Sequence, residues 1–261
     1  MPSTYAHYRF GTALLPAMPG DVRRTIQRFR RLFDMGLHGP DIFYYYSPLI
    51  KSGASFLGIK YHEVTGQDFF QRVCRTVRLE KSEAAQAYLY GVLCHYCLDT
   101  CMHPYVREQA ALCGVSHARI ETEFDRFLLE TDGKLPPNPR HLTPHMRLTP
   151  GECETVAKFY PPASSRNVEQ AIKHMAFFTG LLCTPEGAKR TVLTKGIDLV
   201  APEFRGMVMT SGADPQCSHL DEPMMEAYNR AAEAFPEMLS QLQAHMTYSA
   251  PFGAEFEGIF G

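Results

Sequence analysis

GVLCHYCLDTCMHP, residues 91–104, is the stretch on which the interpretation of the chain rests, because it carries His95, Asp99 and His103 at steps of four. Each residue of an α-helix advances by about 100°, so residues four apart drift by only about 40° and form one row on one face. Two imidazoles and a carboxylate in such a row suit a divalent cation such as zinc. The stretch therefore predicts a helix that presents metal ligands.

A histidine alone on a helix more often belongs to the core or the surface than to a metal site. Here Asp99 lies among apolar residues, and an unpaired buried carboxylate costs several kcal/mol. A second pair, His117 and Glu121, follows at the same spacing of four. The two rows together predict a metal site in the first half of the chain.

The composition is that of a globular protein, with 261 residues, 45% hydrophobic and 21% charged. A net charge of -2 excludes a global basic field for nucleic acid. No apolar run reaches the roughly 18 residues of a membrane span, and the opening MPSTYAHYRF lacks the pattern of a signal peptide. We therefore expect a soluble cytoplasmic protein without a transmembrane segment.

Eight cysteines are present, and Cys94, Cys97, Cys101 and Cys113 lie around the predicted site. Cys94 and Cys97 form a C-x-x-C motif, but no second such pair exists to complete a thiolate zinc site. We expect buried, reduced thiols that pack a helix, with a thiolate metal site as the alternative.

The remaining chain favours an all-α helical bundle, since no period-2 strand pattern of any length occurs. Capping residues at Ser3, Asp21, Thr65, Ser82 and Ser116 mark helix starts, and Thr149 with Glu152 resembles a capping box. The expected helices cover residues 4–15, 22–33, 66–79, 83–103, 117–129, 150–160, 164–182, 185–194 and 221–246.

Prolines and glycines predict where the helices are interrupted. Pro104 lacks an N–H and should end or kink the central helix. Residues 36–48 should not form one regular helix, and residues 51–60 should be a loop. We expect one helical domain over 1–261, with a metal-ligand half 1–133, a proline-rich connection 134–150 on the surface, and C-terminal helices 151–261.

An arginine-rich face is predicted on the second helix, comprising Arg23, Arg24, Arg28, Arg30 and Arg31. We interpret it as solvated surface, with steering of phosphate or a membrane surface as the alternative.

Three further ligand candidates lie outside the two rows. His7 falls in the apolar first helix, Asp41 follows Gly39-Pro40 in a loop, and His62 shortly precedes a cap. Taken singly, each favours a different interpretation: a packed N-terminal histidine for His7, a helix N-cap for Asp41 and a surface residue for His62. With the two rows they give eight ligand-type residues, enough for two or three metal ions. His38, two residues before Pro40, is a candidate for a supporting role.

The order H…GPD…H…HxxxDxxxHP…HxxxE resembles the zinc-dependent phospholipase C family, which includes relatives of the S1/P1 nucleases. The resemblance spans residues 1 to about 130 and is carried by His7, Asp41, His62, His95, Asp99, His103, Pro104, His117 and Glu121. It implies an all-helical domain that holds a trinuclear zinc cluster at the bottom of a cleft.

The resemblance also implies how the ligands are shared. His62, His95 and Asp99 would hold one zinc with Asp41 close by; His103, His117 and Glu121 would hold a second; His7 would help to hold a third, bridged by Asp99 or Asp41. Secreted members complete the third site with an N-terminal Trp. This chain has no Trp, so we expect two or three zinc ions.

Phosphoester hydrolysis suits such a cluster, because zinc ions clamp phosphoryl oxygens and lower the pKa of bound water toward 7. Asp41 is the best candidate to orient that water or take its proton, and its role as a bridging ligand stays open beside this one. Members that cleave phosphatidylcholine have an aromatic residue directly after the loop Asp, where this chain has Ile42. The following Phe43, Tyr44, Tyr45 and Tyr46 are either a displaced choline cage or core.

Three functions follow as hypotheses. The first is a zinc-dependent phosphodiesterase of phospholipase C type, with a phosphoester or phospholipid substrate. The second is a phosphomonoesterase or nuclease-like hydrolase on the same cluster. The third is a non-catalytic protein in which zinc serves stability.

Overall fold

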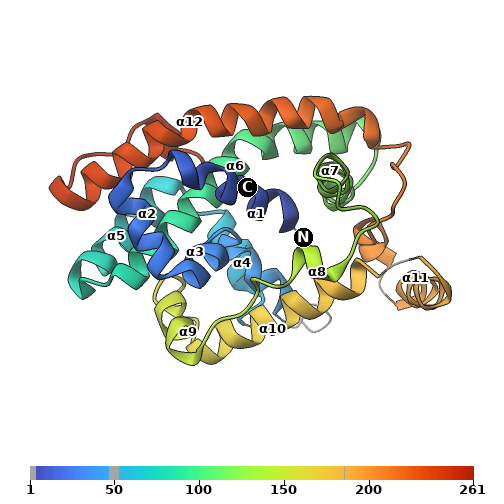
Figure 1. The fold of residues 1–261 in the computed structure, drawn as a ribbon, viewed down its shortest axis with the longest axis horizontal. Helices are drawn as coiled ribbons and strands as arrows, with labels where there is room; N and C mark the ends of the chain where they lie inside the picture. The colour runs from blue at the N-terminus through green and yellow to red at the C-terminus, as the bar shows by residue number, and fades with distance from the viewer. Residues whose placement is uncertain (1–3, 47–52, 185, 201) are drawn as a thin grey trace.

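Helices make up the regular structure of the protein. A computed structural model describes residues 4–46, 53–184, 186–200 and 202–261. Within these ranges no strand forms, and an isolated antiparallel bridge joins Thr65 and Ile259. The expectation of an all-α fold is confirmed (Figure 1).

Helix α6 (Glu83–Cys113) runs through the molecule and carries the first ligand row. Ser82 caps it as predicted, since its hydroxyl oxygen accepts a hydrogen bond from the Ala85 N–H. The prediction that the helix ends at His103 is wrong, because α6 continues through Pro104 to Gly114, whose φ of 64° ends it. Pro104 removes only one N–H and lies on the exposed side, while buried residues on both sides of it keep the helix packed.

Helices α1 (Thr4–Leu14), α2 (Gly20–Arg28) and α3 (Arg30–Gly36) all pack against α6 (Figure 1). Ser3, the predicted cap of the first helix, lies outside the described residues, and the short helix η1 (Leu15–Ala17) follows α1. The expected single helix over 22–33 is wrong, since Phe29, with φ -121° and ψ 42°, separates α2 from α3. Asp21 lies in the first turn of α2 and is not its cap.

The closest approach of α3 to α6 depends on two glycines. A Cβ on Gly91 would lie 2.3 Å from the carbonyl oxygen of Phe33, and one on Gly36 would lie 2.4 Å from that of Tyr88. Both distances are shorter than any real contact, so larger residues would push the helices apart. This contact holds the segment after α3 against the ligand row of α6.

That segment forms the 3-10 helix η2 (Gly39–Tyr45), which confirms that no regular α-helix covers this region. The predicted loop over 51–60 is wrong from Phe56 onward, where α4 (Phe56–His62) begins; residues 47–52 lie outside the described residues. Burial of Leu57 and Tyr61 stabilises α4 despite its weak sequence signal. Helices α5 (Gly66–Glu80) and α7 (His117–Thr131) are capped by Thr65 and Ser116 as predicted.

The second half is helical as well, and its elements complete the fold. They are α8 (Pro139–Leu142), α9 (Pro150–Ala157), α10 (Ser165–Leu182), α11 (Ala188–Val200), η3 (Pro202–Met207), η4 (Ser218–Leu220), α12 (Asp221–Tyr248) and η5 (Ala254–Phe256). The capping box of Thr149 and Glu152 is confirmed. Helix α11 ends later than the expected 194, and residue 185 lies outside the described residues.

The proline-rich connection 134–150 is more than a surface loop. Leu142 and Met146 are buried in the core, so the expected linker or surface loop is anchored at these two residues. Opposite it, α12 packs along α6 and runs across the top of Figure 1.

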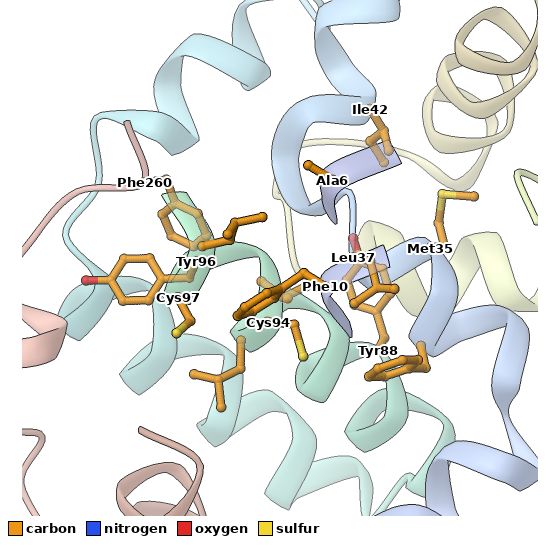
Figure 2. Close-up of a cluster of buried hydrophobic side chains, with 14 of the residues drawn as sticks. Ala6, Phe10, Met35, Leu37, Ile42, Tyr88, Cys94, Tyr96, Cys97 and Phe260 are labelled. Carbon is orange, nitrogen blue, oxygen red and sulfur yellow. The ribbon is translucent and has the colours of Figure 1, made fainter. Parts of the chain in front are cut away.

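A large hydrophobic core extends from Tyr5 to Phe260 and includes Cys94 and Cys97 (Figure 2). All eight cysteines are free thiols, and none belongs to a metal-type cluster of the described residues. On the basic face, acidic side chains pair with arginines: Arg28 with Glu83, Arg30 with Asp34, and Arg31 with Glu152. None of the described helices combines the length and apolar character needed to cross a membrane.

Candidate metal centre

Asp41 reaches the ligand row of α6 because of the turn before it. Gly39 has a φ of 47°, a region that glycine enters without a steric penalty. A Cβ at Gly39 would lie 2.6 Å from the ring of His95, so only glycine fits against this imidazole. The next turn of η2 then places the Asp41 carboxylate, 1% exposed, between His62 and His95.

These three residues form the loop group (Asp41, His62 and His95), whose candidate ligand atoms lie within 4.8 Å of one another. His62 Nε2 is 2.8 Å from an Asp41 oxygen, while His62 Nδ1 donates to the carbonyl oxygen of Gly58 at 2.6 Å. A carbonyl only accepts, so Nδ1 carries the proton and the lone pair of a neutral ring lies on Nε2. That lone pair faces a carboxylate, and a metal ion or a proton between the two atoms would relieve their repulsion.

The inner group (His7, His95 and Asp99) lies deeper, between α1 and α6. His7 Nε2 is 3.2 Å and His95 Nε2 is 2.9 Å from the Asp99 carboxylate, and the two rings stack with centroids 4.3 Å apart. Among the described residues, His7 Nδ1, His95 Nε2 and Asp99 Oδ2 are buried without a well-aligned hydrogen bond. Buried polar atoms without hydrogen bonds indicate a missing bound group, and an ion between these residues would supply it.

Helix α7 fixes the start of α1 and thereby His7. The Asp125 carboxylate accepts hydrogen bonds from the backbone N–H groups of Tyr5 at 2.9 Å and Ala6 at 2.7 Å. The first N–H groups of a helix have no partner within it, so this carboxylate serves as their cap. His7 is the next residue and is held at the inner group.

The outer group (His103, His117 and Glu121) joins α6 to α7. Glu121 Oε1 is 3.4 Å from His103 Nε2 and 3.2 Å from His117 Nε2. His103 Nε2 is also 3.3 Å from Asp99, which connects the outer group to the inner one. The His117 side chain keeps 35% of its surface exposed, so this group faces solvent.

The charges of the groups reinforce one another. Burial alone would raise the pKa of Asp99, but His103, His95 and His7 hold it well below its usual value. Burial would lower the pKa of His103, yet Asp99 and Glu121 raise it to about 9. His117 and His103 overcome burial at Glu121 and lower its pKa. The carboxylates of Asp99 and Glu121 are therefore ionised.

Backbone carbonyls orient the histidines from behind. The carbonyl oxygen of Leu37 accepts from His95 Nδ1 at 3.2 Å. The carbonyl oxygen of Gly58 accepts from His62 Nδ1 at 2.6 Å, and that of Phe260 accepts from His103 Nδ1 at 3.1 Å. Each hydrogen bond at Nδ1 fixes the tautomer that offers Nε2 to a metal, as in known zinc sites. The donor set and its unpaired buried atoms fit zinc.

A cleft of about 490 Å³ opens onto the loop and outer groups. Its lining comprises Asp41, Tyr44, His62, His103, Arg107, Ser116, His117, Ala118, Glu121 and Gly261. All eight ligand candidates from the sequence are thus brought to the three groups, two of which border the cleft.

Of the aromatic run after Asp41, Tyr44 lines the cleft, whereas Phe43 and Tyr45 are buried in the core. Ile42 is also in the core (Figure 2). Tyr46 accepts a hydrogen bond from Asn167. The core interpretation therefore applies to Phe43 and Tyr45.

His38 lies behind the centre, and its Nε2 is 2.7 Å from Nε2 of His145. Burial and the nearby histidines lower the pKa of His38, while burial and Arg30 lower that of His145 to about 3. Sequence reasoning missed His145, which comes from the proline-rich connection. His219 and His245 are not part of the three groups.

The C-terminal segment reaches the centre from far along the sequence. Besides the Phe260 carbonyl, the Gly261 N–H donates to the His62 carbonyl oxygen at 3.4 Å. The Tyr96 hydroxyl donates to the carbonyl of Gly258 at 2.9 Å and anchors the segment to α6. Its sequence, FEGIFG, carries no pattern from which this contact could be predicted.

Comparison with protein families accounts for this arrangement. The family model described as zinc dependent phospholipase C matches residues 6–172, which include all eight ligand candidates and most of the chain. The chain belongs to the zinc-dependent phospholipase C family. No curated protein and no solved structure matched it in the corresponding searches. Membership of the zinc-dependent phospholipase C family implies a zinc-dependent hydrolase.

Proposed function

We propose that the chain hydrolyses phosphodiesters in the manner of a phospholipase C, with zinc at the three groups and water as the nucleophile. The observation that carries this proposal is the convergence of five histidines and three carboxylates beside an open cleft. A purely structural zinc site is closed by four protein ligands, whereas a catalytic one keeps an open position. The loop and outer groups each offer three ligand residues, and all of these except His95 line the cleft.

We assign two or three zinc ions to these residues. Asp41, His62 and His95 would hold one ion, and His103, His117 and Glu121 a second. His7 would help to hold a third ion, bridged by the Asp99 carboxylate, because the single Nε2 lone pair of His95 serves only one ion. This assignment places Asp41 in a ligand group, where the family resemblance alone left it close to the first ion.

Bound zinc would neutralise phosphoryl charge and favour ionisation of water near neutral pH. The protein itself positions the substrate and handles the proton. Asp41 comes from a short rigid turn, lines the cleft, and has one oxygen without a hydrogen bond among the described residues. That free oxygen can orient a water molecule and accept its proton.

The test is zinc content per chain, measured together with hydrolysis of a chromogenic phosphodiester and a phosphomonoester. We expect two or three zinc ions and diester turnover that a chelator abolishes and added zinc restores. Asp41→Asn should lose turnover, while Asp68→Asn, on the exposed side of α5, should not. Thermal unfolding with and without zinc checks that the variants are folded.

The other hypotheses predict different results. Hydrolysis of the monoester alone would indicate a phosphomonoesterase on the same cluster. Bound zinc that raises the unfolding temperature, with no turnover of either ester, would indicate a non-catalytic zinc protein and contradict the proposal.

A further inference from the structure

Arg107 extends the ligand row of α6 by one more turn. It follows His103 by four residues, as His103 follows Asp99, so the same helix face that presents ligands next presents a guanidinium. Arg107 lines the cleft together with Asp41, His62 and the outer group. Among the described residues, no other Lys or Arg belongs to the cleft lining.

Arg107 also differs from the arginines of the neighbouring helix. Arg119 pairs with Asp214 at 2.6 Å, and Arg126 pairs with Glu123 at 2.7 Å. Arg107 has no hydrogen bond or ion pair with any residue in the described part of the chain. Its charge is therefore available to a ligand in the cleft.

The cleft is poorly suited to a choline-like cation. Such a cation binds over aromatic faces or beside free carboxylates. Tyr44 is the aromatic residue of the cleft lining, and its ring lies against His62 with centroids 4.9 Å apart. The other candidates for a cage, Phe43 and Tyr45, are in the core. A positive guanidinium in the same cleft would repel a quaternary ammonium group.

The charges of the three groups indicate what kind of chemical group Arg107 binds. The three groups contain three carboxylates, Asp41, Asp99 and Glu121. Two zinc ions already exceed their negative charge, so the loaded centre would attract the reacting phosphoryl group by itself. An additional positive charge in the cleft favours a substrate with a second anionic group.

We propose that Arg107 determines substrate specificity by pairing with a negative group outside the reacting phosphodiester. The preferred substrates would be phosphodiesters whose headgroup carries a further anion, such as a second phosphate. This inference rests on the proposed function. A guanidinium is well suited to the role because it makes paired hydrogen bonds to phosphate oxygens.

The test uses the zinc-loaded protein and three short-chain lipids: a phosphatidylinositol, the same lipid with one phosphate on the inositol ring, and a phosphatidylcholine. We expect kcat/KM to be highest for the ring-phosphorylated lipid, by about 10- to 100-fold, as for a charge-assisted hydrogen bond. Arg107→Gln should remove this preference and leave the rate on the unphosphorylated lipid within about threefold. Arg107→Lys should retain part of it.

Arg75→Gln is the matched control, because it removes one exposed arginine that does not line the cleft. An equal loss of kcat on all three lipids in Arg107→Gln would overturn the proposal, since it would place Arg107 on the reacting phosphoryl group. A preference of the unaltered protein for phosphatidylcholine, or no preference, would overturn it as well.

Absence of any turnover would defeat the proposed function separately. Calorimetric binding of the soluble headgroups, glycerophosphoinositol and its ring monophosphate, then tests Arg107 directly. We expect the monophosphate to bind at least tenfold more tightly, and Arg107→Gln to abolish the difference. Equal binding of both headgroups would overturn the proposal.

Discussion

The inner group and the outer group use the same residue types in opposite environments. In the inner group, the side chains of His7, His95 and Asp99 are at most 3% exposed, and several of their polar atoms lack aligned partners. In the outer group, His117 is open to the cleft and Glu121 lies beside two imidazoles. Buried unpaired atoms depend on a cation for stability, whereas accessible ligands allow exchange. We infer that the inner group stabilises the fold and the outer group handles substrate.

Asp99 links the two environments, since its carboxylate lies within 3.3 Å of His7, His95 and His103. Asp99→Asn should therefore have the largest effect of any single change on zinc content. We expect loss of zinc from both groups and a fall in kcat/KM of more than about 100-fold, the upper effect of altering a supporting residue. Elemental analysis and kinetics measure both.

Glu121→Gln is the matched comparison, because Glu121 touches only the outer group. It should reduce zinc content by about one ion and lower activity, with the inner group retained. If both variants lost the same amount of zinc, the distinction between the groups would be wrong.

Stepwise chelation should separate the groups by accessibility. The outer ion should leave first, with loss of activity and a small change in unfolding temperature. Removal of the inner ion should follow at higher chelator concentration and lower the unfolding temperature strongly, because an ion that binds only the folded state stabilises it. Simultaneous loss in one step would contradict the comparison.

Two glycines with positive φ test how the loop group is held. Gly114 has φ 64° and open space around it, so Gly114→Ala should cost about 1 kcal/mol of unfolding free energy and leave zinc content unchanged. Gly39→Ala carries the same backbone cost and also presses on the His95 ring. It should lower zinc affinity as well, measured by competition with a chromogenic chelator. Equal zinc affinity in both variants would show that Gly39 does not position the site.

The smallest effect concerns pH in the metal-free protein. The folded-state pKa of His103 is about 9, above its ordinary value of 6.5. The stability that it contributes is therefore fully present below pH 6.5 and declines as pH rises through 9. Glu121→Gln should weaken this dependence by removing a charge partner of His103. Denaturant unfolding of both metal-free proteins at pH 6 to 10 measures how the free energy of unfolding depends on pH. The same pH dependence in Glu121→Gln and the unaltered protein would show that Glu121 does not raise the pKa of His103.

Local signals predicted much of this molecule because its ligands lie on helices of regular spacing. The rows of His95 and His117 and the caps at Thr65, Ser82 and Ser116 follow from residues four or fewer positions apart. The helix end predicted at Pro104 was wrong because buried residues on both sides of Pro104 keep the helix packed, and this outweighs the loss of one backbone hydrogen bond. The contacts of His145 with His38 and of Phe260 with His103 arise from tertiary folding across more than 100 residues, and no local pattern contains them. The spacing of four between His103 and Arg107 is visible in the sequence, but whether the Arg107 guanidinium has a partner depends on the residues that the fold places around it.

The most direct test of the three-group centre is anomalous diffraction from crystals of the zinc-loaded protein, collected on both sides of the zinc absorption edge. We expect strong peaks about 2.0–2.2 Å from Nε2 of His62 and His95 and from the outer-group ligands. The outer-group ion should have a coordination position open to the cleft. Absence of peaks at these residues, or a single zinc closed by four protein ligands, would contradict the account.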